Sequence, residues 1–341
     1  MDENIRRMQD FADLHGKQLR PHVKTHKSID IGRRQIAAGA VGITAGTIGE
    51  AEVFAAAGFD DIFLAYPIWP TGGKASRLAA LAARTRLRVG VENVAAVDAL
   101  VPALGDRRGS VGLVIEVDCG AHRSGIAPHQ AGRLARCARA RGLRVDGVFT
   151  YPGHGGRAGS REGAARDQAV ALRAAVAALA DEGIRAEVVS AGSSPTVAFS
   201  TDDVITELRP GEYVFNDVDN HSLGACELDQ IGLFVATTVV SDQGHDHVVV
   251  DAGTKALARE GDPVRGWGQV PALGGVLSRL NEYHGFLRLP AGGARPPVGS
   301  VVPLVPHHVC PVVNSFDELI LTDRRGSDLG TWTVHARGRL N

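Results

Sequence analysis

The feature that constrains this sequence most is the alternation of short apolar runs with helix-like segments over its first two-thirds. Eight runs of strand length follow one another: RPHVKTH, VGITAG, DIFLAYP, RLRVGVEN, VGLVIEVD, VDGVFTYPGH, AEVVSAGS and VITELRPGEYVF. Between them, segments such as 129–142 and 161–183 carry apolar residues at helical spacing. Strands that alternate with helices form parallel sheets. We therefore expect an α/β fold in which eight strands close into a (β/α)8 TIM-like barrel. An open doubly wound sheet is the alternative, although no GxGxxG motif opens a first helix.

The pattern changes near residue 230. Later runs such as IGLFVATTVVSD, HDHVVVDAG and GSVVPLVP are rich in β-branched residues and are separated by Gly, Pro and Asp turns. Such a pattern is typical of an all-β domain. We expect a barrel domain over residues 1–230 and a smaller β-rich domain over residues 231–341.

Composition excludes several classes of partner. Lys and Arg number 37 against 38 Asp and Glu, and no basic block suits nucleic acid. No apolar run approaches the roughly 20 residues that span a bilayer, so we expect no membrane partner. The N-terminal MDENIRRMQDF is polar and helical rather than a signal peptide. Four scattered cysteines without a CxxC pair indicate a reduced, cytoplasmic protein.

In a (β/α) barrel the active site lies at the carboxyl ends of the strands. The polar residues expected there are Lys24, His26, Tyr66, Glu92, Asn93, Asp118, Arg123, Tyr151, His154, Gly192, Ser193, Ser194, Arg209 and Tyr213. Strand ends are also polar simply because loops are. A lysine inside the strand-like HVKTH, however, is costly to desolvate unless it is paired or neutralised. A buried lysine with a lowered pKa can form a Schiff base.

The stretch LRPHVKTHKS supplies this lysine. Strand alternation places His22, Lys24 and His26 on one face, where the histidines would orient the lysine. Lys27 falls past the expected strand end, so we predict that it is solvated.

Two further stretches could bind ligands. In SAGSSPTVAF a strand runs into Gly192, Ser193 and Ser194 before an apparent helix start, and backbone N–H groups there could hold a phosphate or serve as an ordinary N-cap. In PHHVCPVVN, a strand would point His308 and Cys310 the same way. Imidazole and thiolate are zinc ligands. From spacing alone, a buried cysteine beside a satisfied histidine is the favoured alternative.

Seven segments, in order, resemble the D-threonine aldolase/D-serine dehydratase family: RPHVKTHKS, IEVDCGAHRSGI, FTYPGH, VSAGSSPT, ELRPGEYVFND, VDAGTKAL and PHHVCPVVN. These are alanine-racemase-like, fold-type III pyridoxal-phosphate (PLP) enzymes with a barrel followed by a β domain. The resemblance covers nearly the whole chain. It also implies a strand of the type TPxxxxDLDxL before the first helix. Met1 stands where that segment would be ending, so either the start codon is mis-assigned or the protein is shortened.

The resemblance assigns roles to the candidate residues. Lys24 would be the Schiff-base lysine, and Gly192, Ser193, Ser194 and Tyr213 would hold the cofactor phosphate. Arg123 would lie near the ring or the substrate carboxylate, and Arg209 near the ring. Tyr151 and His154 would line the substrate pocket as catalytic residues, with Tyr151 also near the cofactor. His308 and Cys310 would bind a divalent metal, Zn²⁺ or alternatively Mn²⁺.

The implied activity is a PLP- and metal-dependent lyase that acts on β-hydroxy-D-amino acids. The thiolate ligand favours D-serine dehydration to pyruvate and ammonia, because the aldolases more often carry His-x-Asp. D-threonine aldolase, which yields glycine and acetaldehyde, is the alternative. An amino-acid racemase would need no metal, and a non-enzymatic PLP carrier would lack the second domain. We expect a homodimer with a small D-amino acid as its substrate.

Overall fold

The computed structural model describes residues 1–341 except 244–245, 262–263 and 324. The chain divides into two compact units. The first, which we call the barrel unit, contains Ile5–Lys24, Ser28–Gly211 and Gly338–Asn341, and the second, the β unit, contains Met1–Asn4, Thr25–Lys27 and Glu212–Arg337. In this division residues 212–230 group with the β unit. The boundary predicted at residue 230 stays a prediction.

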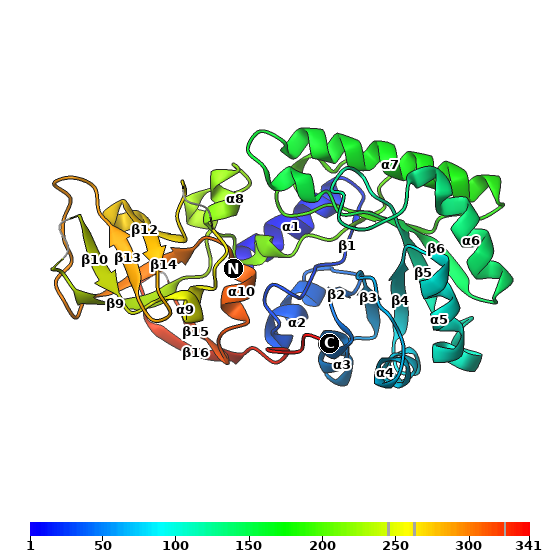
Figure 1. Cartoon of the computed structure of the whole chain (residues 1–341), viewed down its shortest axis with the longest axis horizontal. Helices are drawn as coiled ribbons and strands as arrows, with labels where there is room; N and C mark the ends of the chain where they lie inside the picture. The colour runs from blue at the N-terminus through cyan, green and yellow to red at the C-terminus, as the bar shows by residue number, and fades with distance from the viewer. Residues whose placement is uncertain (244–245, 262–263, 324) are drawn as a thin grey trace. The chain divides into compact units, whose positions relative to one another are not determined.

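The barrel unit is built on an eight-stranded parallel sheet with the order β1-β8-β7-β6-β5-β4-β3-β2. Figure 1 labels β1 to β6 of this sheet. Its strands are β1 (Gln18–Leu19), β2 (Ile43–Ala45), β3 (Asp61–Leu64), β4 (Arg86–Val91), β5 (Gly112–Glu116), β6 (Arg144–Phe149), β7 (Val188–Ala191) and β8 (Glu207–Leu208). A parallel bridge between His22 and Thr44 joins the chain after β1 to β2, so the two edges of the sheet meet. The eight predicted strands and the (β/α)8 barrel type are confirmed.

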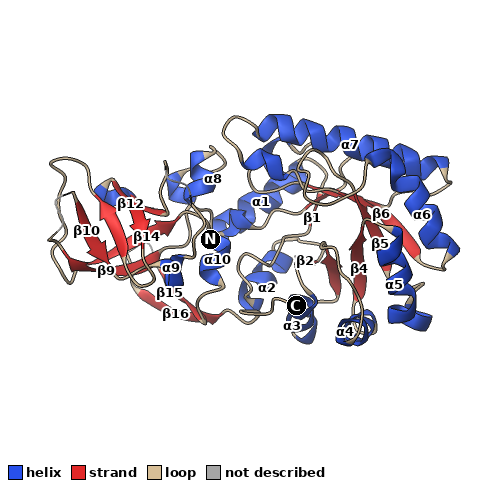
Figure 2. Ribbon diagram, in the orientation of Figure 1, coloured by secondary structure: helices blue, strands red, loops and turns tan. Residues whose placement is uncertain are grey.

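Helices pack outside this sheet (Figure 2). They are α1 (Asp2–Leu14), α2 (Ile29–Ala37), α3 (Ile48–Ala56), α4 (Gly73–Ala82), α5 (Val94–Leu104), α6 (Ala131–Ala140) and α7 (Arg161–Asp181). Local chemistry sets their starts: the side chains of Thr47 and Asn93 accept hydrogen bonds from the third residue of α3 and α5, as N-caps do. From α3 to α7 each helix contacts the next. The outer layer therefore follows chain order, as expected for repeated βα units.

The barrel interior combines apolar and charged side chains. Phe63, Val114 and Phe149 form a buried cluster, in which the two rings pack edge-to-face at 5.1 Å. Nearer the amino ends of the strands, the Arg20 guanidinium donates to Glu207 and Asp61, at 2.7 Å each. Arg88 extends this network from Asp61 to Asp146. Each buried charge of this network thus has a partner of opposite sign, which offsets the cost of desolvation.

The stretch around Lys24 departs from the predicted strand. Regular pairing ends at Leu19, His22 makes the bridge, and residues 23–26 form a turn. Strand alternation therefore does not set the faces of residues 22, 24 and 26, and that prediction is wrong. Lys27 is also buried rather than solvated, because its ammonium donates to the Asn314 side-chain oxygen at 2.7 Å.

The β unit contains a closed antiparallel barrel with the order β10-β13-β12-β11-β14-β9. Its strands are β9 (Val235–Ser241), β10 (His247–Val250), β11 (Gly268–Val270), β12 (Gly275–Leu280), β13 (Gly285–Arg288) and β14 (Val301–Pro306), and β15 (Glu318–Thr322) with β16 (Asp328–Thr333) forms a separate hairpin. Short helices are α8 (Val218–Ser222), α9 (Thr254–Leu257) and α10 (Val309–Val313). The predicted all-β domain is confirmed. In the described part of the chain, no helix has both the length and the apolar character needed to cross a bilayer.

Candidate active site

Lys24 lies beyond the carboxyl end of β1. Its backbone N–H donates to Nδ1 of His22 at 3.3 Å, so His22 does support the lysine segment, although through the backbone. Gly46, just after β2, lies beside it: a Cβ built on Gly46 would be 3.5 Å from the His22 ring and 3.9 Å from the Lys24 Cβ. The partly buried lysine side chain thus belongs to the end of the barrel where active sites of this fold form.

Arg209 follows β8 and is buried between two aromatic rings. Its guanidinium carbon lies 5.5 Å from the centre of the Phe63 ring and 5.0 Å from that of Phe149. One nitrogen donates to the carbonyl of Thr150 at 2.8 Å. Burial lowers the pKa of Arg209 to about 10, although Glu207 and Glu116 counteract part of this effect. Among the described residues Nε has no hydrogen-bond partner. A fixed, incompletely satisfied cation of this kind can face a polar cofactor atom.

Two predicted site residues, Arg123 and Tyr151, are in contact, since the guanidinium carbon lies 4.8 Å from the ring centre. His154 follows in the 3-10 turn Gly153–Gly156, and its Nε2 lies 3.0 Å from a carboxylate oxygen of Asp167 on α7. Its Nδ1 is buried and has no partner among the described residues. The loops after β5 and β6 therefore gather an arginine, a phenol and a histidine whose second nitrogen makes no hydrogen bond to the described residues.

Glu116, the last residue of β5, was not among the predicted site residues. Its carboxylate accepts a hydrogen bond from the Ser124 hydroxyl at 2.8 Å. Burial raises the pKa of Glu116, although Ser124, Arg123 and Arg209 lower it in part. An acidic residue within the apolar VGLVIEVD was the available signal. Its buried carboxyl stands among the candidate cationic residues and can hold a proton more readily than a solvated one.

The predicted phosphate turn is only partly open. The N–H of Gly192, whose φ is 85°, donates to Oε1 of Gln168 at 3.1 Å. The N–H of Ser193 donates to the Thr196 hydroxyl at 3.1 Å, and the two hydroxyls lie 3.0 Å apart. Two of the three expected backbone donors thus have partners within the chain. Tyr213 is buried and belongs to the β unit, so its role beside this turn stays a prediction.

The β unit brings together His308, Cys310 and a residue that sequence reasoning missed, Glu212. One ligand atom from each lies within 4.8 Å of the others. His308 is the N-cap of α10 and Cys310 lies within that helix, so the expected strand is wrong although the side chains converge. The Thr25 hydroxyl is 3.2 Å from the Cys310 sulfur. Glu212 is one of three acidic residues in the quoted segment ELRPGEYVFND, and this was the available signal.

The charges of this cluster favour a cation. Burial alone would lower the pKa of His308, but Cys310, Asp217 and Glu212 together raise it to about 12. Nε2 of His308 and Sγ of Cys310 lie 3.8 and 4.0 Å from Oε1 of Glu212. Nitrogen, sulfur and carboxylate oxygen are the ligand types of zinc, and three protein ligands leave one position for water or substrate. The residues present fit a catalytic divalent metal.

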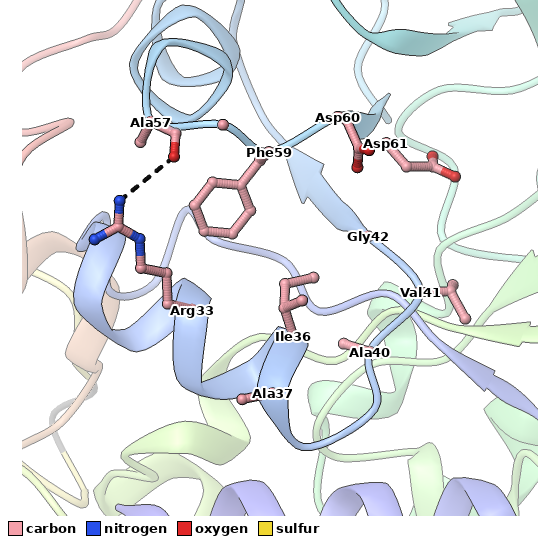
Figure 3. A pocket seen from close by; sticks show the side chains of 11 residues that line it. Arg33, Ile36, Ala37, Ala40, Val41, Gly42, Ala57, Phe59, Asp60 and Asp61 are labelled. Atoms are coloured by element: carbon pink, nitrogen blue, oxygen red, sulfur yellow. Dashed lines mark hydrogen bonds between the residues drawn. The ribbon is translucent and has the colours of Figure 1, made fainter.

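A surface pocket of about 330 Å³ lies at the other end of the barrel unit (Figure 3). Arg33 and Ile36 of α2, Phe59 and the acidic pair Asp60 and Asp61 line it. The aspartates stand at the amino end of β3, whereas Lys24 follows the carboxyl end of β1. None of the candidate catalytic residues lines this pocket.

Comparisons with known proteins match two parts of the chain to two different family models. Residues 1–218 match the family model described as alanine racemase, N-terminal domain, and residues 232–322 match a putative serine dehydratase domain. The chain is 38% identical to D-threo-3-hydroxyaspartate dehydratase of Delftia sp. (strain HT23), over 91% of this chain and 88% of that protein. It is 34% identical to D-threonine aldolase of Arthrobacter sp, over 99% and 90%.

Solved structures agree as well. The crystal structure of D-threonine aldolase from Filomicrobium marinum superposes with a TM-score of 0.91 and 30% identity, over 100% of this chain and 93% of that one. Both domain matches, the identities and the shared fold point to one group. The chain belongs to the D-threonine aldolase/D-serine dehydratase family of alanine-racemase-like, fold-type III PLP enzymes.

Proposed function

We propose that this protein is a PLP- and metal-dependent lyase that eliminates water from a β-hydroxy-D-amino acid. The observation that carries the proposal is the convergence of Glu212, His308 and Cys310 in a chain of this family. D-Serine, which would give pyruvate and ammonia, is the favoured substrate. Retro-aldol cleavage of D-threonine to glycine and acetaldehyde is the alternative, and racemisation is a lesser one.

The barrel unit would hold the cofactor. Lys24 would be the attachment residue. Arg209, whose Nε makes no hydrogen bond to any residue that the structure describes, would face the cofactor ring. The hydroxyls of Ser193 and Ser194 would bind the phosphate, since the N–H groups of Gly192 and Ser193 are already used. Bound PLP supplies an electron sink for the substrate α-carbon.

The candidate metal ligands would serve the reaction at the β-hydroxyl of the substrate. Zn²⁺ suits the thiolate of Cys310, whereas Mn²⁺ prefers oxygen ligands and is the second choice. A bound Zn²⁺ would supply a Lewis acid that helps the hydroxyl leave. Lys24 Nζ would remove the α-proton in the dehydration. A racemase needs no such ligand set, so the cluster disfavours that reaction.

The aldolase reaction would use the other candidate base. In that reaction the β-hydroxyl loses its proton, and His154, whose Nδ1 has no partner in the described part of the chain, would accept it. Tyr151 and Arg123 would line the substrate pocket and bind its carboxylate. The thiolate at position 310 favours dehydration over cleavage. We also propose a cytoplasmic homodimer.

Product analysis tests the proposal. The PLP- and zinc-loaded protein is incubated separately with D-serine, D-threonine and D-threo-3-hydroxyaspartate, with the L-enantiomers as controls. We expect a 2-oxo acid and ammonia from a D-substrate, and loss of activity with a chelator that zinc reverses. Glycine plus an aldehyde would establish the aldolase alternative. Activity unaffected by the chelator would overturn the metal assignment.

A further inference from the structure

A second layer of side chains lies behind the three candidate metal ligands. Asp217, which is 0% exposed, is the N-cap of α8 and accepts the Asn220 N–H at 2.9 Å through Oδ1. Its other oxygen, Oδ2, accepts the Val309 N–H at 2.9 Å and lies 3.3 Å from Nδ1 of His308. One buried carboxylate therefore ties α8, the start of α10 and the His308 ring together.

The Asn220 side chain acts on the second ligand. Its amide nitrogen donates to Oε2 of Glu212 at 3.2 Å, whereas Oε1 of Glu212 is the oxygen nearest to His308 Nε2 and Cys310 Sγ. The carboxylate of Glu212 is thus held with one oxygen engaged and the other turned toward the cluster. α8 and its cap contact two of the three ligands.

We propose that Asp217 is a positioning residue for the metal site. It accepts the Nδ1 proton of His308 and so leaves Nε2, which lies 3.8 Å from Glu212 Oε1, as the metal-binding nitrogen. Histidine ligands commonly donate their other N–H to a carboxylate, which fixes the tautomer and the ring orientation. The inference rests on the proposed metal-dependent function, because it assumes that His308 is a ligand.

Zinc affinity of the PLP-loaded protein tests the role of Asp217, measured at one pH by competition with a chromogenic chelator. Asp217→Asn should weaken zinc binding by about tenfold to a hundredfold, as loss of such partners does. Asp219→Asn is the matched control, because Asp219 lies in the same helix and pairs with Arg265 instead. Wild-type affinity in a folded Asp217→Asn protein would overturn the proposal.

A wild-type measurement covers the case in which Asp217→Asn fails to fold. NMR of zinc-loaded protein labelled with ¹⁵N-histidine should show His308 protonated at Nδ1 and bound to zinc through Nε2. Coordination through Nδ1 would overturn the assignment. These outcomes are distinguishable from failure of the proposed function. If wild-type protein does not bind zinc at all, the metal site is wrong. If zinc binds but His308 has the other tautomer, only the role of Asp217 is rejected.

Discussion

Replacing Arg20 with methionine should destabilise the barrel unit severely. The Arg20 side chain is 2% exposed, and its partners Glu207 and Asp61 are 1% and 14% exposed. Burial alone would lower the pKa of Arg20, but the two carboxylates outweigh burial and raise it. In Arg20→Met, Glu207 would keep the hydrogen bond from the Ser190 hydroxyl, 2.6 Å from Oε1, and the weaker electrostatic interaction with Arg209. It would lose its ion pair with Arg20 and would leave a buried carboxylate without a directly paired cation in the described part of the chain.

Removing one partner of a buried ion pair costs about 3–5 kcal/mol. For a domain of roughly 150–250 residues, each kcal/mol lowers Tm by about 2–4 °C. The expected loss is therefore roughly 6–20 °C. Because Arg20 directly follows β1, which leads to Lys24, we also expect weaker retention of PLP at elevated temperature. Differential scanning calorimetry of the PLP-loaded protein measures the fall in Tm, and the visible absorbance of PLP during the same heating measures its retention.

Two further variants isolate the cause. Arg20→Met with Glu207→Gln should recover most of the loss, because glutamine is neutral and still accepts from Ser190. Arg6→Met is the exposed control: Arg6 and Asp10 are each 61% exposed, and such pairs contribute about 1 kcal/mol or less. Equal losses for Arg20→Met and Arg6→Met, or no recovery in the double variant, would refute the reasoning.

Three other outcomes follow from the site. Lys24→Ala should lose the visible absorbance of lysine-bound PLP while the exposed control Lys74→Ala keeps it; a persistent band would move attachment to another lysine. Cys310→Ser should lose stoichiometric zinc by metal analysis, because a neutral hydroxyl replaces the thiolate, whereas Cys137→Ser should bind normally, and retained zinc in Cys310→Ser would reject the ligand. Glu116→Gln tests how the stability of the protein depends on the protonation of Glu116. Burial raises the folded-state pKa of Glu116. Its contribution to the free energy of unfolding is therefore fully present below the unfolded pKa of about 4.3 and is lost as pH rises through the folded pKa. The Tm of Glu116→Gln relative to wild type should therefore rise with pH above about 4, and a pH-independent difference would contradict the shift.

The barrel was predictable because its strands are buried on both faces. Such strands appear in the sequence as compact apolar runs, and seven of the eight runs overlap β2 to β8, whereas RPHVKTH directly follows β1. The position of Lys24 followed from the same rule, since parallel strands end at a common mouth. Helical periodicity likewise placed α6 and α7. These are local signals, and the order of the strands and helices along the chain then gives their places in the barrel.

Other features were not predictable from local pattern. Alternation suggested that residues 22–26 continue a strand, but turn formation after His22 overrides it. HHVC was interpreted as a strand, whereas His308 caps a helix that places Cys310 in its first turn. Glu212 is distant in sequence from both residues and joins them only through folding. Metal sites assembled from separate segments leave no fixed spacing to detect.

The four residues from Lys24 to Lys27 belong to two different compact units. Lys24 belongs to the barrel unit, whereas Thr25–Lys27 group with the β unit. There the Thr25 hydroxyl meets the Cys310 sulfur, the Lys27 ammonium binds Asn314, and the Lys27 carbonyl accepts the Ala336 N–H. Two of these three contacts are made with α10 and its C-cap, the segment that carries the thiolate. The buried environment of Thr25 and Lys27 therefore reflects packing in the β unit, and this is why strand alternation failed directly after the lysine.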